Sequence, residues 1–466
     1  MEYYGRKEEL SILESKYQSE RFEFGYLYGQ RRIGKTSLIE MFKHNHKSIV
    51  LFATDSDDTK IRESFCNQLA EQTGLIGFYN DWDGFLKAIG DYFGDDKGIV
   101  VIDEYPNIVL TRDGKRKSTD FISKLQKAID YQYKYQKFTL LLTGSNVTFM
   151  EKEIKDTKAP LYERHTFQLQ LFKFEWDEAI ISLKKIDNYE KAKILALTNT
   201  YPLYLSLIDD RVNFDDNLNN LFYNRAATFV DDPSKLFTSA IAESGFYASI
   251  LDSIANGVDT VSGIANKLKA DTGKVSKYMD ELLESSIVSK KTVFMSSRQT
   301  YYIINDPMLA FYYRFIRDNV EMIKLGYGKL IKQKQENAIE DFIHRYFENE
   351  CIEYLKYLNK KGQLLDLYYD FQNYRVENSS LGRSVEIDIV ASTNGCLLIG
   401  ESKLTKNKRT IKDYYDMLED ISIPPFTSFK NKELYLFGSS GFTNELLAIS
   451  DSNLHLIDLN KMFDLH

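Results

Sequence analysis

The chain has 466 residues, a hydrophobic fraction of 43%, 7 Pro and 24 Gly, a composition typical of folded globular proteins. Its length exceeds the size at which one hydrophobic core stops growing, so two or three domains are expected. The formal net charge of -8 argues against a protein that coats nucleic acid nonspecifically, but it is compatible with a local basic groove. No apolar run approaches the ~18 residues of a membrane helix. The three scattered cysteines lack zinc-ligand or disulfide spacing, so we expect a cytoplasmic protein without a membrane partner.

The first candidate site is a phosphate-binding loop between a predicted strand and a predicted helix. The stretch FGYLYGQRRIGKTSLIEMF, residues 24–42, contains G-x-x-x-x-G-K-[ST]. Glycines in this pattern let successive backbone N–H groups converge on phosphate oxygens, while Lys35 reaches the outer phosphates. The Thr36 hydroxyl is expected to ligate Mg²⁺, and the helix N-terminus adds its positive end. The predicted nucleotide-binding residues of the loop are Gly29, Gln30, Arg31, Arg32, Ile33, Gly34, Lys35, Thr36 and Ser37.

Two further apolar strands end in polar residues that are expected beside this loop. The predicted strands are FGYLY from residue 24, KSIVLFATD at 47–55, KGIVVIDEYPNI at 97–108, FTLLLTGSN at 138–146 and HTFQLQLF at 165–172. Strands alternating with helices predict an α/β fold, a doubly wound parallel sheet of the P-loop NTPase type, with ligand at the carboxyl ends of the strands. We expect Asp103 to hold Mg²⁺ through its water shell and Glu104 to orient or deprotonate the attacking water. Either Ser145 or Asn146 is expected to sense the terminal phosphate.

The order of the motifs YYGRKEEL, GQRRIGKTSLI, VVIDEYP, LLLTGSN, APLYER and NTYPLYL resembles a P-loop ATPase family found mainly in archaea and also in bacteria. That family is related to the signal-transduction branch of AAA-type ATPases, and the resemblance covers roughly the first half of the chain. It implies ATP as the ligand. It also implies that Arg164 acts on a nucleotide, because the family's PLYGR segment carries an arginine at this position. Glu163 replaces the family's glycine, so a structural pair between Glu163 and Arg164 stays open as an alternative. Tyr201 and Pro202 stand where the family's G-x-P-x-Y-L starts a lid helix near the base, although an ordinary helix N-terminus explains them equally well.

From residue 240 to 304 the pattern predicts three helices and a hairpin. The order is that of a winged helix-turn-helix, a module that the ATPase family named above commonly carries at this place. Residues expected to face a DNA groove are Lys274, Ser276, Lys277 and Tyr278 in the third helix and Arg298 in the wing. The segment 252–306 carries seven basic and seven acidic side chains. A neutral module binds phosphates weakly, so DNA and a protein partner stay open as alternatives.

The stretch VEIDIVASTNGCLLIGESK, residues 385–403, predicts two short apolar strands that nevertheless carry charged side chains. In a strand, Glu401 and Lys403 share one face while Ser402 points away, and Asp388 lies across from them on the paired strand. An unpaired buried carboxylate is costly, so these charges require a partner.

A preceding amphipathic helix, residues 337–355, adds Glu348 beside its apolar stripe. A helix carrying Glu, a strand with Asp and a neighbouring Glu-x-Lys resemble the PD-(D/E)xK nucleases, and the region also resembles the domain that usually follows this ATPase family. Mg²⁺ held by Glu348, Asp388 and Glu401 is therefore expected, with Lys403 positioning the nucleophile. The alternative is a structural ion pair between Asp388 and Lys403 and a vestigial metal site.

The predicted organisation is a P-loop ATPase core at 1–180, a helical lid at 181–235, a winged helix-turn-helix at 236–316 and an α/β PD-(D/E)xK nuclease-like domain at 330–466. The preferred hypothesis is a Mg²⁺-dependent ATP-hydrolysing switch that presents the nuclease-like domain on or near DNA. The rival is a nucleotide-regulated signalling or scaffold protein whose nuclease-like domain is inactive. Arg164 acting on a second copy would require a homo-oligomer, whereas pairing with Glu163 would let a monomer suffice.

Overall fold

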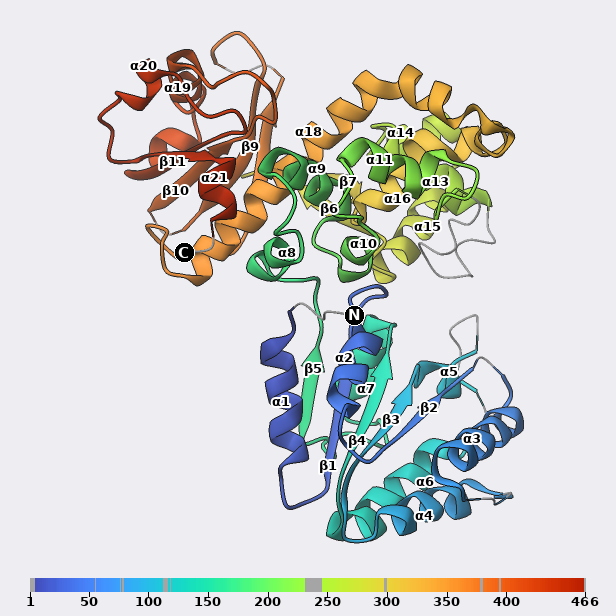
Figure 1. The fold of residues 1–466 in the computed structure, drawn as a ribbon. Coiled ribbons are helices and arrows are strands. Elements are labelled where there is room, and N and C mark those ends of the chain that lie inside the picture. Colours follow the sequence, from blue (N-terminus) through green and yellow to red (C-terminus); the bar gives the residue numbers. More distant parts are fainter. Residues whose placement is uncertain are drawn as a thin grey trace. The chain divides into compact units, whose positions relative to one another are not determined.

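The structure is a computed structural model that describes residues 5–54, 56–75, 77, 79–111, 116–117, 119–230, 245–296, 300–377, 380–393 and 395–464. The chain forms two compact units, residues 1–174 and residues 175–466 (Figure 1). The first unit contains one five-stranded sheet, and the second contains a two-stranded and a five-stranded sheet. Within the described ranges, no helix is both long and apolar enough to cross a membrane.

Five parallel strands form the sheet of the first unit, in the order β2-β3-β4-β1-β5. They are β1 (Glu23–Tyr28), β2 (Ser48–Phe52), β3 (Lys97–Asp103), β4 (Lys137–Gly144) and β5 (Phe167–Gln170). Continuous apolar runs are typical of strands that are covered on both faces, and every residue of β1 is buried. The predicted parallel sheet is thereby confirmed.

Helices cover both faces of this sheet. They are α1 (Lys7–Tyr17), α2 (Lys35–Lys43), α3 (Asp58–Thr73), α4 (Trp82–Phe93), α5 (Pro106–Val109), α6 (Phe121–Lys127) and α7 (Val147–Lys155), with a π-helical turn η1 (Ala128–Gln132) and a 3₁₀ turn η2 (Tyr133–Tyr135). Phe65, Trp82 and Phe121 of α3, α4 and α6 share one core with the strand residues Tyr26 and Leu140. The rings of Trp82 and Phe121 meet edge to face with centroids 4.8 Å apart.

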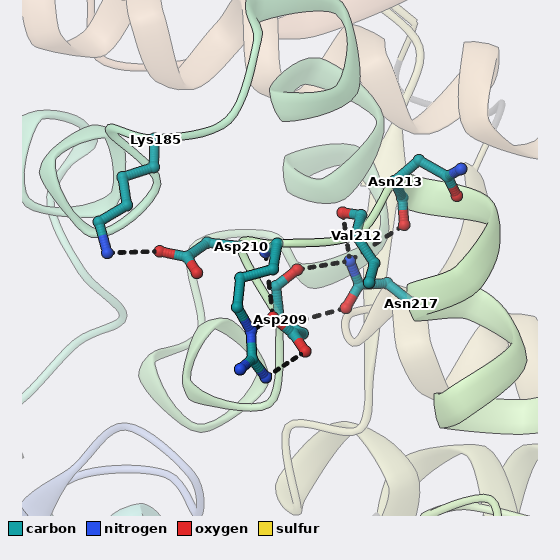
Figure 2. A network of polar contacts seen from close by, with 7 residues as sticks. Lys185, Asp209, Asp210, Val212, Asn213 and Asn217 are labelled. Carbon is teal, nitrogen blue, oxygen red and sulfur yellow. Dashed lines mark hydrogen bonds and ion pairs between the residues drawn. The ribbon is translucent and has the colours of Figure 1, made fainter.

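The second unit begins with a series of short helices, and hydrogen bonds hold the loop that precedes α11. These are α8 (Trp176–Ser182), α9 (Asn188–Thr198), α10 (Pro202–Ser206), α11 (Phe214–Leu218) and the π-helical turn η3 (Asn219–Tyr223). Figure 2 shows Asn217 holding the loop that precedes it: its Nδ2 donates to the backbone oxygens of Asp209 at 3.1 Å and Val212 at 3.3 Å. Its Oδ1 accepts from the backbone N of Asp209 at 2.9 Å. The amide of Asn217, only 2% exposed, is therefore hydrogen-bonded where it is buried.

Three helices and a hairpin follow in the predicted order. They are α13 (Gly245–Ala255), α14 (Val261–Leu268), α15 (Thr272–Glu284), β6 (Val288–Thr292) and β7 (Thr300–Ile304), with β6 and β7 antiparallel. The side chains of Thr260 and Asp271 cap α14 and α15, which explains why these helices begin where they do. The connection onward consists of α16 (Pro307–Phe311), η5 (Tyr312–Ile316), η6 (Arg317–Asn319), α17 (Val320–Met322) and η7 (Ile323–Tyr327).

A long helix and a mixed sheet complete the second unit. The elements are α18 (Gly328–Lys360), β8 (Gln372–Val376), β9 (Val385–Ser392), β10 (Cys396–Glu401), α19 (Ile411–Asp420), η8 (Phe426–Ser428), β11 (Asn431–Gly438), α20 (Asn444–Leu447), β12 (Leu454–Asp458) and α21 (Leu459–Phe463). The strand order is β12-β11-β10-β9-β8, antiparallel from β8 to β10 and parallel from β10 to β12. The predicted helix and hairpin are present, whereas β8 and β12 were not predicted.

Candidate functional site

The phosphate-binding loop lies at the carboxyl edge of the first sheet, between β1 and α2. Gly34 adopts φ 85° and ψ 26° directly before α2, a left-handed conformation that glycine accepts without steric cost. A Cβ atom on Gly29 would lie 2.4 Å from the backbone oxygen of Leu171, so the loop passes too close to that segment for any larger residue. Thr36 and Ser37 are exposed in the first turn of α2, where a ligand can reach their hydroxyls.

Lys35 lies inside this loop and is 7% exposed. Its Nζ donates to the backbone oxygens of Gly29 at 2.7 Å and Gln30 at 3.0 Å. Burial lowers the pKa of Lys35 to about 8, although the nearby carboxylates of Glu104 and Asp103 act in the opposite direction. Lys35 and both predicted acids therefore belong to one electrostatic site, as the sequence predicts.

Asp103 ends β3 beside the carboxyl end of β4. The register pairs Ile102 with Leu142, which places Thr143 next to Asp103. Thr143 donates from Oγ1 to Oδ1 of Asp103, and the backbone N of Glu104 donates to the same oxygen at 3.0 Å. The other oxygen, Oδ2, accepts no hydrogen bond from the part of the chain that the structure describes. This donor set fits Mg²⁺ bound through water, because one carboxylate oxygen is held and the second is available.

Glu104 is held by the residue predicted to sense phosphate. The hydroxyl of Ser145 donates to Oε1 of Glu104, and the backbone N of Ser145 lies 3.4 Å from Oε2. Glu104 has φ 54°, a left-handed conformation that is uncommon for a residue with a side chain. Asn146, the other predicted sensor, caps α7 by accepting from the backbone N of Phe149 at 3.0 Å. Of the two, Ser145 is the one that contacts a predicted catalytic group.

A buried arginine that was not predicted as a site residue supports the loop. Arg6, 4% exposed, donates from Nη2 to the backbone oxygens of Ile33, at 2.8 Å, and Phe172. Its Nη1 donates to Oε1 of Glu9 at 2.7 Å. The planar guanidinium is suited to joining several acceptors, and here it joins the loop to the segment after β5. The signal was present in the motif YYGRKEEL, whose arginine received no role.

Arg164 lies just before β5, at the amino edge of the sheet, and the phosphate-binding loop lies at the carboxyl edge. Its Nε and Nη2 donate to Oδ1 and Oδ2 of Asp130 at 2.9 Å and 3.0 Å. The alternative that Arg164 pairs with Glu163 is therefore wrong: Glu163 is exposed, and the partner is Asp130. Glu163 has φ 59°, which is the conformation that explains a glycine at this place in the family motif.

Tyr201 and Pro202 lie in the second unit, where Pro202 occupies the first turn of α10. This confirms the helix N-terminus that the sequence predicts there. Thr200, at the place of the glycine in G-x-P-x-Y-L, has φ 55° and is 1% exposed. The backbone thus keeps the glycine conformation although the glycine is absent, at a cost in strain.

Two of the side chains expected to face a DNA groove, Lys274 and Tyr278, contact aromatic rings of α13 in the module itself. Tyr278 packs on Phe246 and Tyr247 of α13, with ring centroids 4.8 Å and 4.7 Å apart, so its assignment to a groove-facing set is corrected. The Nζ of Lys274 lies 4.3 Å from the centroid of the Phe246 ring. Lys277 is exposed and Ser276 partly exposed. Arg298 lies outside the described residues.

The second candidate site combines α18, β9 and β10. The register pairs Gly400 with Ile389, so Glu401 and Asp388 come next to each other at the open end of the hairpin. Burial and the nearby Asp388 carboxylate raise the pKa of Glu348 to about 8. Burial, followed by the charge of Asp388, raises the pKa of Glu401 well above its usual range. The three predicted carboxylates are therefore near enough to interact.

Two predictions about this hairpin are wrong: that Ser402 points away from the site, and that Lys403 pairs with Asp388. Both extended the strand beyond Glu401, where β10 ends. Beyond the strand, alternation no longer fixes the side-chain direction. Ser402 does not point away, since its N and Oγ donate to Oδ2 of Asp388 at 2.8 Å and 3.0 Å. Lys403 is 47% exposed, and its Nζ lies 3.5 Å from Oδ1 of Asp413. Within the described part of the chain, Lys403 makes its ion pair with Asp413 and none with Asp388.

Arg409 is the cation of this site that the sequence did not predict. It is 5% exposed, and it donates from Nε to the backbone oxygen of Phe437 at 3.1 Å and from Nη1 to Oδ1 of Asp413 at 3.2 Å. Its charge opposes the rise in the pKa values of both Asp388 and Glu401 that burial causes. In the described ranges, no three His, Cys, Asp or Glu side chains converge closely enough to hold a metal ion. The expected ligands Glu348, Asp388 and Glu401 thus form a carboxylate cluster without preformed metal geometry.

Two known protein families match parts of this chain. The family described as an ATPase domain predominantly from Archaea matches residues 3–208, and a family of archaeal and bacterial proteins of unknown function matches residues 312–413. The first part of the chain is therefore similar to an ATPase domain of this archaeal type, in agreement with the predicted resemblance. The second match overlaps the region 330–466, which is predicted to resemble the domain that usually follows it, and begins earlier, at residue 312.

Individual relatives are found in archaea. The Methanocaldococcus jannaschii protein MJECL04 is 26% identical over 362 residues, which are 77% of this chain and 78% of that protein. The ATP-binding protein MJ0423 of the same organism is 47% identical over 45 residues, 10% of this chain and 76% of its own. The Walker-type ATPase PABY2304 of Pyrococcus abyssi has a similar fold, with a TM-score of 0.50 and 18% identity over 67% of this chain and 96% of that one.

Proposed function

We propose that the protein is a Mg²⁺-dependent ATP-hydrolysing switch whose nucleotide state controls how its second unit is presented. The observation that carries this proposal is the meeting of Lys35, Asp103 and Glu104 at the carboxyl edge of one parallel sheet. Binding of phosphate requires the cation, and hydrolysis requires the two acids.

In this proposal, each residue has one task. Lys35 exchanges its two carbonyl acceptors for phosphate oxygens, which are stronger acceptors because they are charged. The backbone N–H groups of the loop and the start of α2 bind the remaining phosphate oxygens. Thr36 and Asp103 would hold Mg²⁺, which neutralises charge on the transferred phosphoryl group. Glu104 orients the attacking water and accepts its proton, and Ser145 releases Glu104 when it contacts the terminal phosphate instead.

A direct test is ATP turnover by the full chain in Mg²⁺. Lys35→Ala is expected to abolish turnover, because it removes the buried charge of the loop that lies beside the two half-buried acids. Lys43→Ala, in the last turn of the same helix, is the matched control and is expected to turn over ATP at the wild-type rate. Undiminished hydrolysis by Lys35→Ala would overturn the assignment.

Arg164 is proposed to act on the nucleotide of a second copy. Its place at the amino edge of the sheet supports action in trans, since its own loop lies at the opposite edge. Mixing Lys35→Ala with Arg164→Ala provides the test. Each variant alone is expected to be inactive, and the mixture is expected to regain turnover at interfaces that combine an intact loop with an intact arginine. No recovery in the mixture would leave Arg164 as a clamp on Asp130.

For the second unit, a metal-dependent nuclease-like activity on or near DNA is proposed. It is supported by the carboxylates Glu348, Asp388 and Glu401 on α18, β9 and β10, together with the matching order of these elements. The rival, an inactive nuclease-like domain in a scaffold protein, is favoured by the Lys403–Asp413 pair and by the absence of a three-ligand group among the described residues.

Cleavage assays separate the two. Plasmid and single-stranded DNA are incubated with Mg²⁺ or Mn²⁺ and either wild type or Asp388→Ala. Metal-dependent cleavage that Asp388→Ala lacks would establish the nuclease. No cleavage by the wild type, together with no metal binding by calorimetry, would establish the scaffold. Asp416→Ala, in α19, serves as a control for an acid outside the cluster.

A further inference from the structure

Thr143 is a buried polar residue at the end of an apolar strand, and no role has been assigned to it so far. It is fully buried on β4, and its hydroxyl donates to Oδ1 of Asp103. The same hydroxyl oxygen lies 3.4 Å from the backbone N of Glu104. Ser145, two residues further along, contacts Glu104. The end of β4 therefore supplies one hydroxyl to each of the two acids.

We infer that Thr143 is a positioning residue that fixes the Asp103 carboxylate for Mg²⁺ coordination. The inference rests on the proposed ATPase function. With Thr143 and the N–H of Glu104 both on Oδ1, the carboxylate has one orientation, and Oδ2 is left for the metal-bound water. Threonine suits this task because branching at Cβ restricts χ1, and so fixes the direction of the hydroxyl. Side chains that hydrogen-bond to a metal ligand typically contribute a factor of about 10–100 to metal affinity.

The same strand contains a natural comparison. Thr139 lies four residues before Thr143, on the same face of β4, and is 1% exposed. Its Oγ1 makes no hydrogen bond to any described residue. A threonine can therefore be buried in β4 without an acceptor, so burial alone does not account for the bond between Thr143 and Asp103.

The experiment measures binding of a fluorescent ADP analogue to the full chain in Mg²⁺ and in EDTA. For Thr143→Val, which keeps the shape and removes the hydroxyl, the gain in affinity from Mg²⁺ is expected to fall about tenfold. The Kd in EDTA is expected to stay at the wild-type value. Thr143→Ser is expected to restore most of the gain, and Thr139→Val is expected to match the wild type. The Mg²⁺ concentration for half-maximal ATP turnover is expected to rise about tenfold in Thr143→Val alone.

Three outcomes decide the matter. An unchanged Mg²⁺ gain in Thr143→Val would overturn the inference. If Thr143→Val fails to fold, loss of the Mg²⁺ gain in a folded Thr143→Ser, whose hydroxyl is intact, would also overturn it. A wild type that binds no nucleotide would overturn the proposed ATPase function itself, and so differs from a failure at Thr143 alone.

Discussion

The ring of Phe294 stacks on the ring of Phe426, with centroids 6.0 Å apart and planes 4° from parallel. Phe294 follows β6 in the hairpin, is 6% exposed and belongs to the hydrophobic core of the C-terminal sheet. Its backbone N donates to the backbone oxygen of Asn373, beside it in β8, at 3.0 Å. Tyr301 of β7 donates to Oδ1 of Asn373 at 3.0 Å. The hairpin predicted as a wing is therefore anchored to the C-terminal sheet both by β7 and by the segment that follows β6.

This anchor predicts a large stability effect at one residue of the hairpin. Phe294→Ala is expected to lower the free energy of unfolding of the second unit by about 3–5 kcal/mol, because it leaves a cavity between the hairpin and the sheet. Met295→Ala, one residue on and 63% exposed, is the control and is expected to change it by less than about 0.5 kcal/mol. Denaturant unfolding measures both. Equal effects of the two substitutions would contradict the anchored hairpin.

We expect Lys35 to take up a proton when nucleotide binds at alkaline pH. Burial holds the pKa of Lys35 at about 8, and charged phosphate oxygens are expected to raise it. At pH 8.5 to 9 binding should therefore take up protons, whereas at pH 6.5 the ammonium is already charged and uptake should vanish. Calorimetry in buffers of different ionisation enthalpy measures the number of protons taken up on binding. Lys35→Arg, charged throughout, is expected to show no uptake at either pH.

In the nucleotide-free protein, the same group makes stability depend on pH. Between about pH 8 and 10.5 the unfolded state holds more protons than the folded state, so stability relative to Lys35→Met should rise with pH across that window. A flat difference would mean that Lys35 is not desolvated.

We expect substitution of Glu163 by glycine to stabilise the protein. Its φ of 59° is strained for glutamate and relaxed for glycine, so Glu163→Gly is expected to stabilise the first unit by about 1 kcal/mol. Glu163→Ala removes the same carboxylate but keeps the strain, and is expected to give no gain. The midpoints of thermal unfolding distinguish them. A gain of equal size in both variants would point to charge instead of backbone strain.

Glu348 predicts a second dependence on pH, measured in EDTA. Because burial raises its pKa to about 8 from 4.5, the folded state holds more protons than the unfolded state between these values, and stability falls as pH rises. Glu348→Gln lacks this dependence, so its stability relative to the wild type should increase as pH rises across the same window. Glu336→Gln, exposed on the same helix, should show no such gain. If Mn²⁺ removes the fall in the wild type, the cluster binds metal.

What the sequence predicts well is local. Four strands of the first unit, β1 to β4, appear as largely apolar runs, and the loop from Gly29 to Ser37 depends on glycine conformations that few other residues can adopt. Asp103 and Ser145 could be placed together because parallel strands align their carboxyl ends.

What the sequence does not predict depends on contacts between distant segments. Arg6 reaches the backbone of Phe172, 166 residues away, and Arg164 reaches Asp130, so neither partner is readable from a motif. Ser402 and Lys403 were misplaced because alternation was extended past Glu401, where β10 ends. Strands β8 and β12 are short and mixed in composition, and the period-2 pattern is too brief to detect in them.

The proposed function depends above all on Glu104, which would promote hydrolysis of a nucleotide held by Lys35. Phosphate release from prebound ATP in a single turnover, by Glu104→Gln beside the wild type, tests it most directly. Glu104→Gln is expected to bind ATP as tightly as the wild type and to release phosphate at least about 100-fold more slowly, as loss of a general base does. Release at the wild-type rate by Glu104→Gln would contradict it.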